Sequence, residues 1–187
     1  MTAPTNTLSA AQLTGDYVLD PTHSRLGFVA RHAMVTKVRG TFEDFEAKAH
    51  LDFEDPTKST AEVTFKIDSV NTHQKQRDEH LRTNDFFDAP TYPEGHFVST
   101  SVVKKDEDSY EMTGDLTLKG ITKPVTLTWE PTGTAKDPFG NTRVGFEGKG
   151  VLNRKDWGIE YNAALETGGV LVSEKITLEF DVSAIKQ

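Results

Sequence analysis

Alternation of apolar and polar residues with a period of two is the strongest pattern in this chain, and it restricts the fold more than any other feature. From Thr60 to Ile67 every second residue is apolar, and the alternation recurs over 112–118, 125–130 and 175–182. Successive side chains of a strand point to opposite faces, so the pattern predicts antiparallel strands with one buried face. Five further segments carry it less regularly: Tyr17–Asp20, Ser24–His32, Val38–Phe53, His96–Lys104 and Arg143–Asn153. We therefore predict nine strands, or eight if the first two of these segments form one interrupted strand.

The long segment Val38–Phe53 changes the parity of its apolar residues partway along. Phe42 lies on one parity and Phe45 on the other. A one-residue bulge near Glu43 and Asp44 would keep both sets of apolar side chains on the buried face.

Helix signals are confined to one stretch, roughly Gln74 to Thr83, with Asn71 or Thr72 as the expected N-cap. With so little helix, the apolar strand faces must cover one another, either in a sandwich or in a closed barrel. Glycines at inward strand positions favour the barrel, because strong coiling of a strand needs residues without a side chain. These glycines are Gly40, Gly114, Gly148 and Gly150.

One domain accounts for the whole pattern, since no internal repeat, low-complexity segment or linker interrupts it. Residues 1–13 are small and polar and are predicted to be a flexible N-terminal tail, which leaves 14–187 for the domain. Residues 1–10 lack the basic and apolar regions of a signal peptide. We therefore expect a cytoplasmic protein, or a periplasmic or secreted one if the chain is a processed form.

Charge and cysteine content exclude several classes of partner. The net charge of −8 and the pI near 5.2 argue against nucleic acid, whose phosphates need a basic patch, and no integral membrane segment is predicted. The absence of cysteine removes disulfides, thiolate zinc sites and cysteine nucleophiles.

Phenylalanine is the prominent aromatic residue, with 11 copies against 2 Trp and 4 Tyr. Its ring has no polar atom, so these side chains either fill a solid core or line an apolar tunnel.

No arrangement typical of catalysis or metal binding stands out. The six histidines lack ligand spacing, so no metal site is predicted. Ser24 follows His23 without the turn that exposes a nucleophile, and we interpret Asp20 and Ser24 as partners of local backbone donors. Two polar clusters remain: Arg77–Arg82, either a solvated helix face or a lid, and Arg154–Gly158, where Arg beside Trp most simply caps a strand end.

The ordered series of motifs closely resembles the YceI-like family of polyisoprenoid-binding proteins, over about residues 15–185. The motifs that carry the resemblance are Tyr17–Ser24 (YVLDPTHS), Gly40–Phe42 (GTF), Arg77–Phe87 (RDEHLRTNDFF), Gly114–Val125 (GDLTLKGITKPV) and Arg154–Gly158 (RKDWG).

The resemblance implies an extended, eight-stranded, antiparallel, lipocalin-like β-barrel with one short helix near its mouth. It also implies a homodimer and a bound polyisoprenoid lipid, such as a polyprenyl diphosphate or an isoprenoid quinone, with no other cofactor. Inward apolar residues are then expected to line a ligand tunnel: Phe28, Phe42, Phe65, Ile67, Phe86, Phe97, Leu116, Leu118, Leu127, Trp129, Phe146 and Leu152. Polar residues of the family motifs and loops are expected near the mouth and the lipid headgroup: His32, Arg77, Asp78, His80, Arg154 and Trp157.

Three functions are open at this point. The leading hypothesis is a non-catalytic carrier of a polyisoprenoid lipid, because an apolar lumen suits a chain without hydrogen-bonding groups. The second is an enzyme acting on such a lipid or on a small ester, with Asp78 or His80 as general base. The third is a solid-cored barrel that serves only as an interaction module. A continuous lumen would exclude the third, and a filled core would exclude the first.

Overall fold

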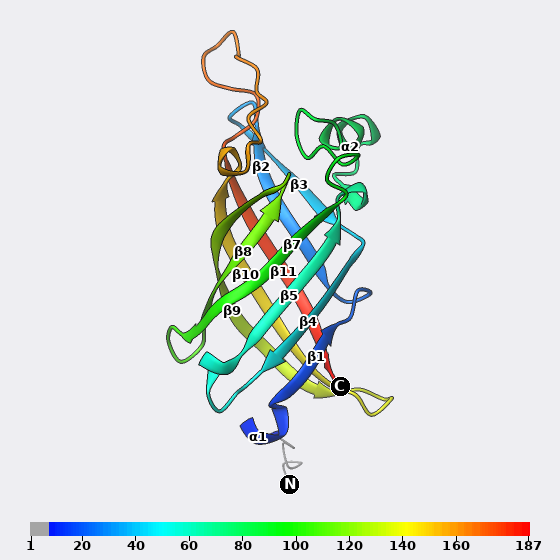
Figure 1. Cartoon of the computed structure of the whole chain (residues 1–187), viewed down its shortest axis with the longest axis vertical. Coiled ribbons are helices and arrows are strands. Elements are labelled where there is room, and N and C mark those ends of the chain that lie inside the picture. The colour runs from blue at the N-terminus through cyan, green and yellow to red at the C-terminus, as the bar shows by residue number, and fades with distance from the viewer. Residues whose placement is uncertain (1–7) are drawn as a thin grey trace.

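The computed structural model describes residues 8–187, which form a tall barrel of strands with helices α1 and α2 at opposite ends (Figure 1). The helical elements are α1 (Ala10–Leu13), α2 (Lys75–Leu81) and the 3-10 turns η1 (Pro56–Lys58), η2 (Ile67–Ser69) and η3 (Arg154–Trp157). The strands are β1 (Gly15–Leu19), β2 (Arg25–His32), β3 (Thr36–Phe42), β4 (Phe45–Leu51), β5 (Thr60–Lys66), β6 (Val70–Asn71), β7 (Glu94–Lys104), β8 (Tyr110–Leu118), β9 (Ile121–Lys136), β10 (Thr142–Asn153) and β11 (Lys175–Lys186). Within these residues, no helix is long and apolar enough to cross a bilayer.

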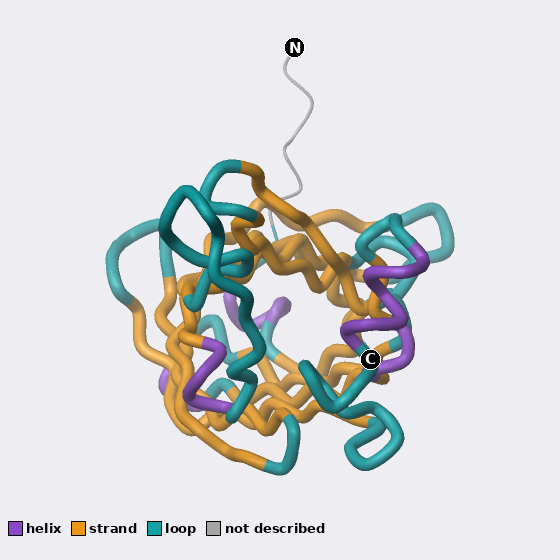
Figure 2. The backbone as a smooth tube through the Cα atoms, turned by 90° about the horizontal axis from the view of Figure 1, so that it is seen from above, coloured by secondary structure: helices purple, strands orange, loops and turns teal. Residues whose placement is uncertain are grey.

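The sheet closes on itself as an eight-stranded antiparallel barrel, which confirms the predicted fold. The ring runs β1–β4–β5–β7–β8–β9–β10–β11 and closes where β1 pairs with the end of β11. Seen from above, the strands surround a central axis (Figure 2). The remaining strands add no position to the ring. β2, β3 and β6 pair in series beside the first half of β11, so they continue β1, β4 and β5 toward the α2 end.

The predicted change of parity in the third segment coincides with a break between two strands. β3 ends at Phe42 and β4 begins at Phe45, so Glu43 and Asp44 form a short interruption rather than a one-residue bulge. Phe45 is buried in the main apolar cluster and Phe42 packs against it. The interruption therefore does what the bulge was expected to do, because both aromatic rings end on the inner side of the barrel.

The helix at the barrel mouth is shorter than predicted, and its expected cap is wrong. α2 has Gln74 at its N-cap position, with no side-chain capping bond. Thr72 is engaged instead with the first turns of the helix: its N–H and its hydroxyl both donate to Asp78 Oδ1, at 2.8 and 2.6 Å. α2, η3 and the segment 158–174 all lie at this end of the barrel (Figure 1).

The opposite end carries α1 and the C-terminus (Figure 1). Of the predicted tail 1–13, residues 1–7 lie outside the described residues. Ser9 begins α1 with a capping box, in which its hydroxyl accepts from the Gln12 N–H. Leu13 is buried against Tyr17 and Val144 in a second, smaller apolar cluster, so this helical turn packs on the end of the barrel.

Candidate binding cavity

One apolar cavity of about 300 Å³ lies inside the barrel. Tyr17 and Phe53 line it at the end that carries α1, and Phe86 and Trp157 line it at the α2 end. The cavity therefore extends along the barrel axis. Its wall is almost entirely carbon, because the inward positions of the strands carry Phe, Leu, Val and Ala.

The structure brings together eleven of the twelve tunnel residues expected from the sequence, all except Ile67. Ile67 is only 1% exposed but packs within the core cluster. The reason is local: β5 ends at Lys66 and the 3-10 turn η2 begins at Ile67, so the strand alternation no longer determines which way the side chain points.

Several residues that the sequence analysis left out also line the cavity: Leu26, Leu81, Phe87, Met112, Leu178 and Phe180. Signals for some of them exist in the sequence. Leu178 and Phe180 belong to the regular alternation over 175–182, and Phe87 follows Phe86 in the α2 segment. Leu81 and Phe87 reach the cavity from outside the strands, which strand periodicity does not reveal.

Aromatic rings of the wall lie over glycines of neighbouring strands. The ring atoms of Phe28 come within 2.4 Å of the position that a Cβ on Gly40 would occupy, and those of Phe65 within 2.2 Å of the Cβ position of Gly95. Two further pairs are alike: Phe97 with Gly114, and Trp129 with Gly148. Each ring occupies the space of the missing side chain and so lies along the wall rather than across the lumen. The inward glycines thus make room for aromatic rings, in addition to the strand coiling that their positions predicted.

Arg154 and Trp157 line the mouth, and the protein itself uses their polar groups. Arg154 is 4% exposed. Its Nε, Nη1 and Nη2 donate to the carbonyls of Ser173, Ile159 and Val172, at 2.8, 2.7 and 3.3 Å. Burial lowers the pKa of this guanidinium from its usual value. Arg154 therefore fastens the segment 158–174 to the barrel rim.

The other residues expected at the mouth are not among the described residues that line the cavity. Arg77 donates from Nε and Nη2 to the hydroxyl and carbonyl oxygens of Thr72, both at 2.6 Å. Asp78 is buried and accepts from Thr72. His32 is exposed and forms an isolated backbone bridge with Val172.

His80 lies where residues 75–87, which contain α2, meet the segment 158–174. Its Nε2 is 2.8 Å from Asp85 Oδ2. Its ring packs edge-on against Phe86, at 5.0 Å between centroids, and against Tyr161, at 4.9 Å. His80 thus links residues 75–87, whose Phe86 lines the cavity, to the segment 158–174.

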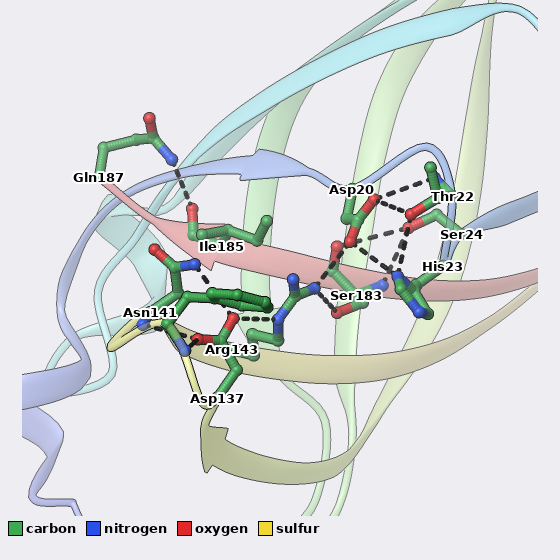
Figure 3. Close-up of polar contacts among 11 residues, drawn as sticks. Asp20, Thr22, His23, Ser24, Asp137, Asn141, Arg143, Ser183, Ile185 and Gln187 are labelled. Carbon is green, nitrogen blue, oxygen red and sulfur yellow. Dashed lines mark hydrogen bonds and ion pairs between the residues drawn. The ribbon is translucent and has the colours of Figure 1, made fainter.

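A polar cluster on the barrel wall joins the β1–β2 connection to the β9–β10 loop (Figure 3). Arg143 bridges two carboxylates, with Nη1 2.8 Å from Asp20 Oδ2 and Nε 2.9 Å from Asp137 Oδ2. The Thr22 hydroxyl, followed by Arg143, holds the pKa of Asp20 well below its usual range, and Arg143 does the same for Asp137.

Ser24 belongs to the same cluster. It accepts from the Ser183 N–H at 3.0 Å, on β11 rather than in its own turn as predicted. With His23 held by Asp20 at 2.8 Å and Ser24 held by β11, these polar side chains are used to connect strands. Within residues 8–187, no group of three or more His, Asp or Glu side chains could hold a metal ion.

Comparison with known proteins gives a consistent result. The YceI-like domain model matches residues 17–184. Protein YceI of Escherichia coli is 36% identical over 181 residues, which cover 96% of this chain and 91% of that protein. The crystal structure of Campylobacter jejuni YceI has a TM-score of 0.73 at 33% identity, covering 84% of this chain and 90% of that one. A structure described as a polyisoprenoid binding domain from Saccharophagus degradans has a TM-score of 0.69 at 17% identity, covering 91% and 98%, a likeness in fold alone. The chain belongs to the YceI-like domain family.

Proposed function

We propose that this protein binds and carries a polyisoprenoid lipid, whose chain lies in the cavity of the barrel, and that it does so without catalysis. The observation that carries the proposal is the apolar cavity that extends from Tyr17 to Trp157. The Saccharophagus degradans domain, which shares the fold, is described as polyisoprenoid binding.

The physical basis is burial of apolar surface. An isoprenoid chain has no hydrogen-bonding groups, so its binding free energy comes from removing carbon from water, at roughly 25 cal/mol per Å². The cavity volume of about 300 Å³ is at the lower limit of the roughly 300–1,000 Å³ common for ligand pockets. We expect a bound tail to fit the wall closely, and a longer tail to extend through the mouth past α2.

The mouth favours an uncharged headgroup over a diphosphate. Burial of a diphosphate requires cations that donate directly to its oxygens. Arg154 gives a hydrogen bond from each of its three nitrogens to backbone carbonyls, and Arg77 donates to Thr72. The two arginines expected to hold an anionic head are therefore already engaged.

The two alternative functions receive less support. Asp78 and His80 are the two alternative general bases of the enzyme hypothesis. Asp78 accepts two hydrogen bonds from Thr72, and His80 is paired with Asp85. Neither is among the described residues that line the cavity. The cavity itself argues against a solid-cored module. The cytoplasmic location and the homodimer stay predictions.

The test is to purify the protein gently from its own host, extract the bound lipid and identify it by mass spectrometry. Phe65→Ala removes a ring from the cavity wall, whereas Phe139→Ala removes one from an 88% exposed loop position and serves as the control. We expect isoprenoid with wild type and with the Phe139 variant, and several-fold less with the Phe65 variant at equal folded protein. Wild-type protein that yields no isoprenoid would refute the proposal.

A further inference from the structure

Two hairpins lie next to each other at the α2 end of the barrel (Figure 1, blue and orange). The first joins β2 to β3 through residues 33–35. The second is formed by residues 163–171, whose two ends pair with each other. The Ala33 N–H donates to the Leu171 carbonyl at 2.7 Å. The two hairpins therefore form one continuous surface.

The tip of the first hairpin exposes large apolar side chains in a strained turn. Met34 is 60% exposed and Val35 is 76% exposed. The Met34 sulfur also lies against Gly169 of the second hairpin, 3.0 Å from where a Cβ would be. Ala33 and Met34 have positive φ angles of 52° and 66°, which residues with a Cβ rarely adopt. A hairpin turn of this kind favours Asn followed by Gly, so the apolar tip is not explained by the needs of the turn.

Positive charge surrounds this tip in a chain whose net charge is −8. Residues 21–42 contain four basic side chains and no acidic one. Three of the four are exposed within five residues of Met34, and within residues 8–187 none of them forms an ion pair: Arg31, Lys37 and Arg39. The second hairpin adds one charged residue, Glu166. Charges more than roughly 8 Å away are screened at physiological ionic strength, so the potential at the tip is positive.

We propose that the two hairpins dock the mouth of the barrel onto the surface of a lipid bilayer with anionic headgroups. The apolar tip enters the boundary between headgroups and acyl chains, and the basic side chains contact the lipid phosphates. The acidic remainder of the surface is repelled by the same bilayer, which keeps this end of the barrel toward it. A second copy of the chain is a poorer partner, because a two-fold dimer through this tip would bring like charges together.

The cavity wall leads directly to this surface. Ala30 of β2 and Val172 both line the cavity. His32 forms a backbone bridge with Val172 at the base of the two hairpins. A docked mouth therefore faces the acyl chains, and an apolar molecule can pass between bilayer and cavity without crossing water. This consequence rests on the proposed function, whereas the docking itself does not.

The test is sedimentation of lipid-free protein with vesicles that contain no isoprenoid, made of phosphatidylcholine alone or mixed with phosphatidylglycerol. Ala33→Asn combined with Met34→Gly gives the turn its preferred residues, so the hairpin should stay folded while it loses its apolar tip. We expect affinity for the mixed vesicles to fall about tenfold, as partial burial of one methionine implies. Phe139→Ala removes an 88% exposed ring from the β9–β10 loop at the opposite end and should bind as wild type does.

Matched charge substitutions test the electrostatic part. Lys37→Gln and Lys136→Gln remove the same charge from opposite ends of the barrel. Only the first should weaken binding, by about fivefold, and Glu166→Gln should strengthen it. Equal effects of the two lysine variants, undiminished binding of the double variant at positions 33 and 34, or wild type that does not bind the mixed vesicles would each overturn the inference. Because the vesicles hold no isoprenoid, these results are independent of lipid carriage, which the extraction from the host tests separately.

Discussion

The pairing of rings with glycines predicts that a single methyl group can narrow the lumen. In Gly95→Ala the new Cβ would lie 2.2 Å from Phe65 Cζ, whereas ordinary contact begins at 3.4 Å, so the ring must move by at least the difference, 1.2 Å. The glycine position is part of the wall, so the ring has to move into the cavity. Overpacking of this kind costs roughly 1–3 kcal/mol of unfolding free energy.

The effect on binding follows from the same displacement. A ring edge that enters the lumen by this distance excludes about one methylene-sized group of the ligand, at about 0.8 kcal/mol. The expected loss is a factor of about 4 in Kd for an isoprenoid. Urea unfolding measures the first quantity, and titration with a short-tailed isoprenoid quinone measures the second.

Two further variants separate this mechanism from a general effect of alanine. Gly145→Ala makes the same substitution on β10, where the new Cβ meets chiefly the Thr132 hydroxyl, the end of a side chain that can rotate away. Gly95→Ala combined with Phe65→Leu removes the clashing ring edge, so its destabilisation should fall below the sum of the two single effects. If Gly95→Ala matches Gly145→Ala in both stability and affinity, the reasoning about the wall is refuted.

Three other predictions concern the polar groups. The pKa values of the two carboxylates bridged by Arg143 are depressed, so their contribution to stability is present above the usual carboxyl range and is lost as the pH falls below about 4. Arg143→Met should lower the free energy of unfolding at pH 7 and reduce its dependence on pH in the acid range, as measured by urea unfolding. Arg154→Met leaves three carbonyls unpaired and should cost about 3 kcal/mol of unfolding free energy, with a smaller cost for Arg154→Lys. Tyr161→Ala removes the contact with His80, and the loss of about 1 kcal/mol should speed lipid release about fivefold in a stopped-flow displacement assay; an unchanged release rate would show that this contact does not close the mouth.

The strands and their buried faces were predictable because strand alternation is a local property. Alternation alone fits a sandwich as well as a barrel, and the inward glycines favoured the barrel. Residues 60–67 and 175–182 each show which side chains point inward, and with one short helix there is nothing else to cover them. The interruption at Glu43 and Asp44 was predictable for the same reason, since a change of parity must be absorbed somewhere in the chain. Ile67 was misplaced because the 3-10 turn at that residue depends on how β5 leaves the barrel, which periodicity does not encode.

The roles of the polar side chains at the mouth could not be predicted in this way, because they depend on which hydrogen-bonding partners the tertiary structure brings close. The family motifs predict that Arg77, His80 and Arg154 lie near the lipid headgroup. In the structure, Arg77 donates hydrogen bonds to Thr72, and His80 is paired with Asp85. Arg154 donates to three carbonyls of the segment 158–174. These partners lie within the motifs or in an irregular segment without a repeating pattern, so residue type alone does not reveal them.

The wall and the mouth together suggest that selectivity lies in the lumen. Arg154 and Arg77 at the rim donate to oxygens of the protein itself and so offer a headgroup few free donors. The lumen, in contrast, has aromatic rings held over glycines. Shape along the wall then discriminates between tails, because a ring held over a glycine has little room to retreat. Substitutions at Gly95 should therefore change the preference of the cavity for one isoprenoid tail over another.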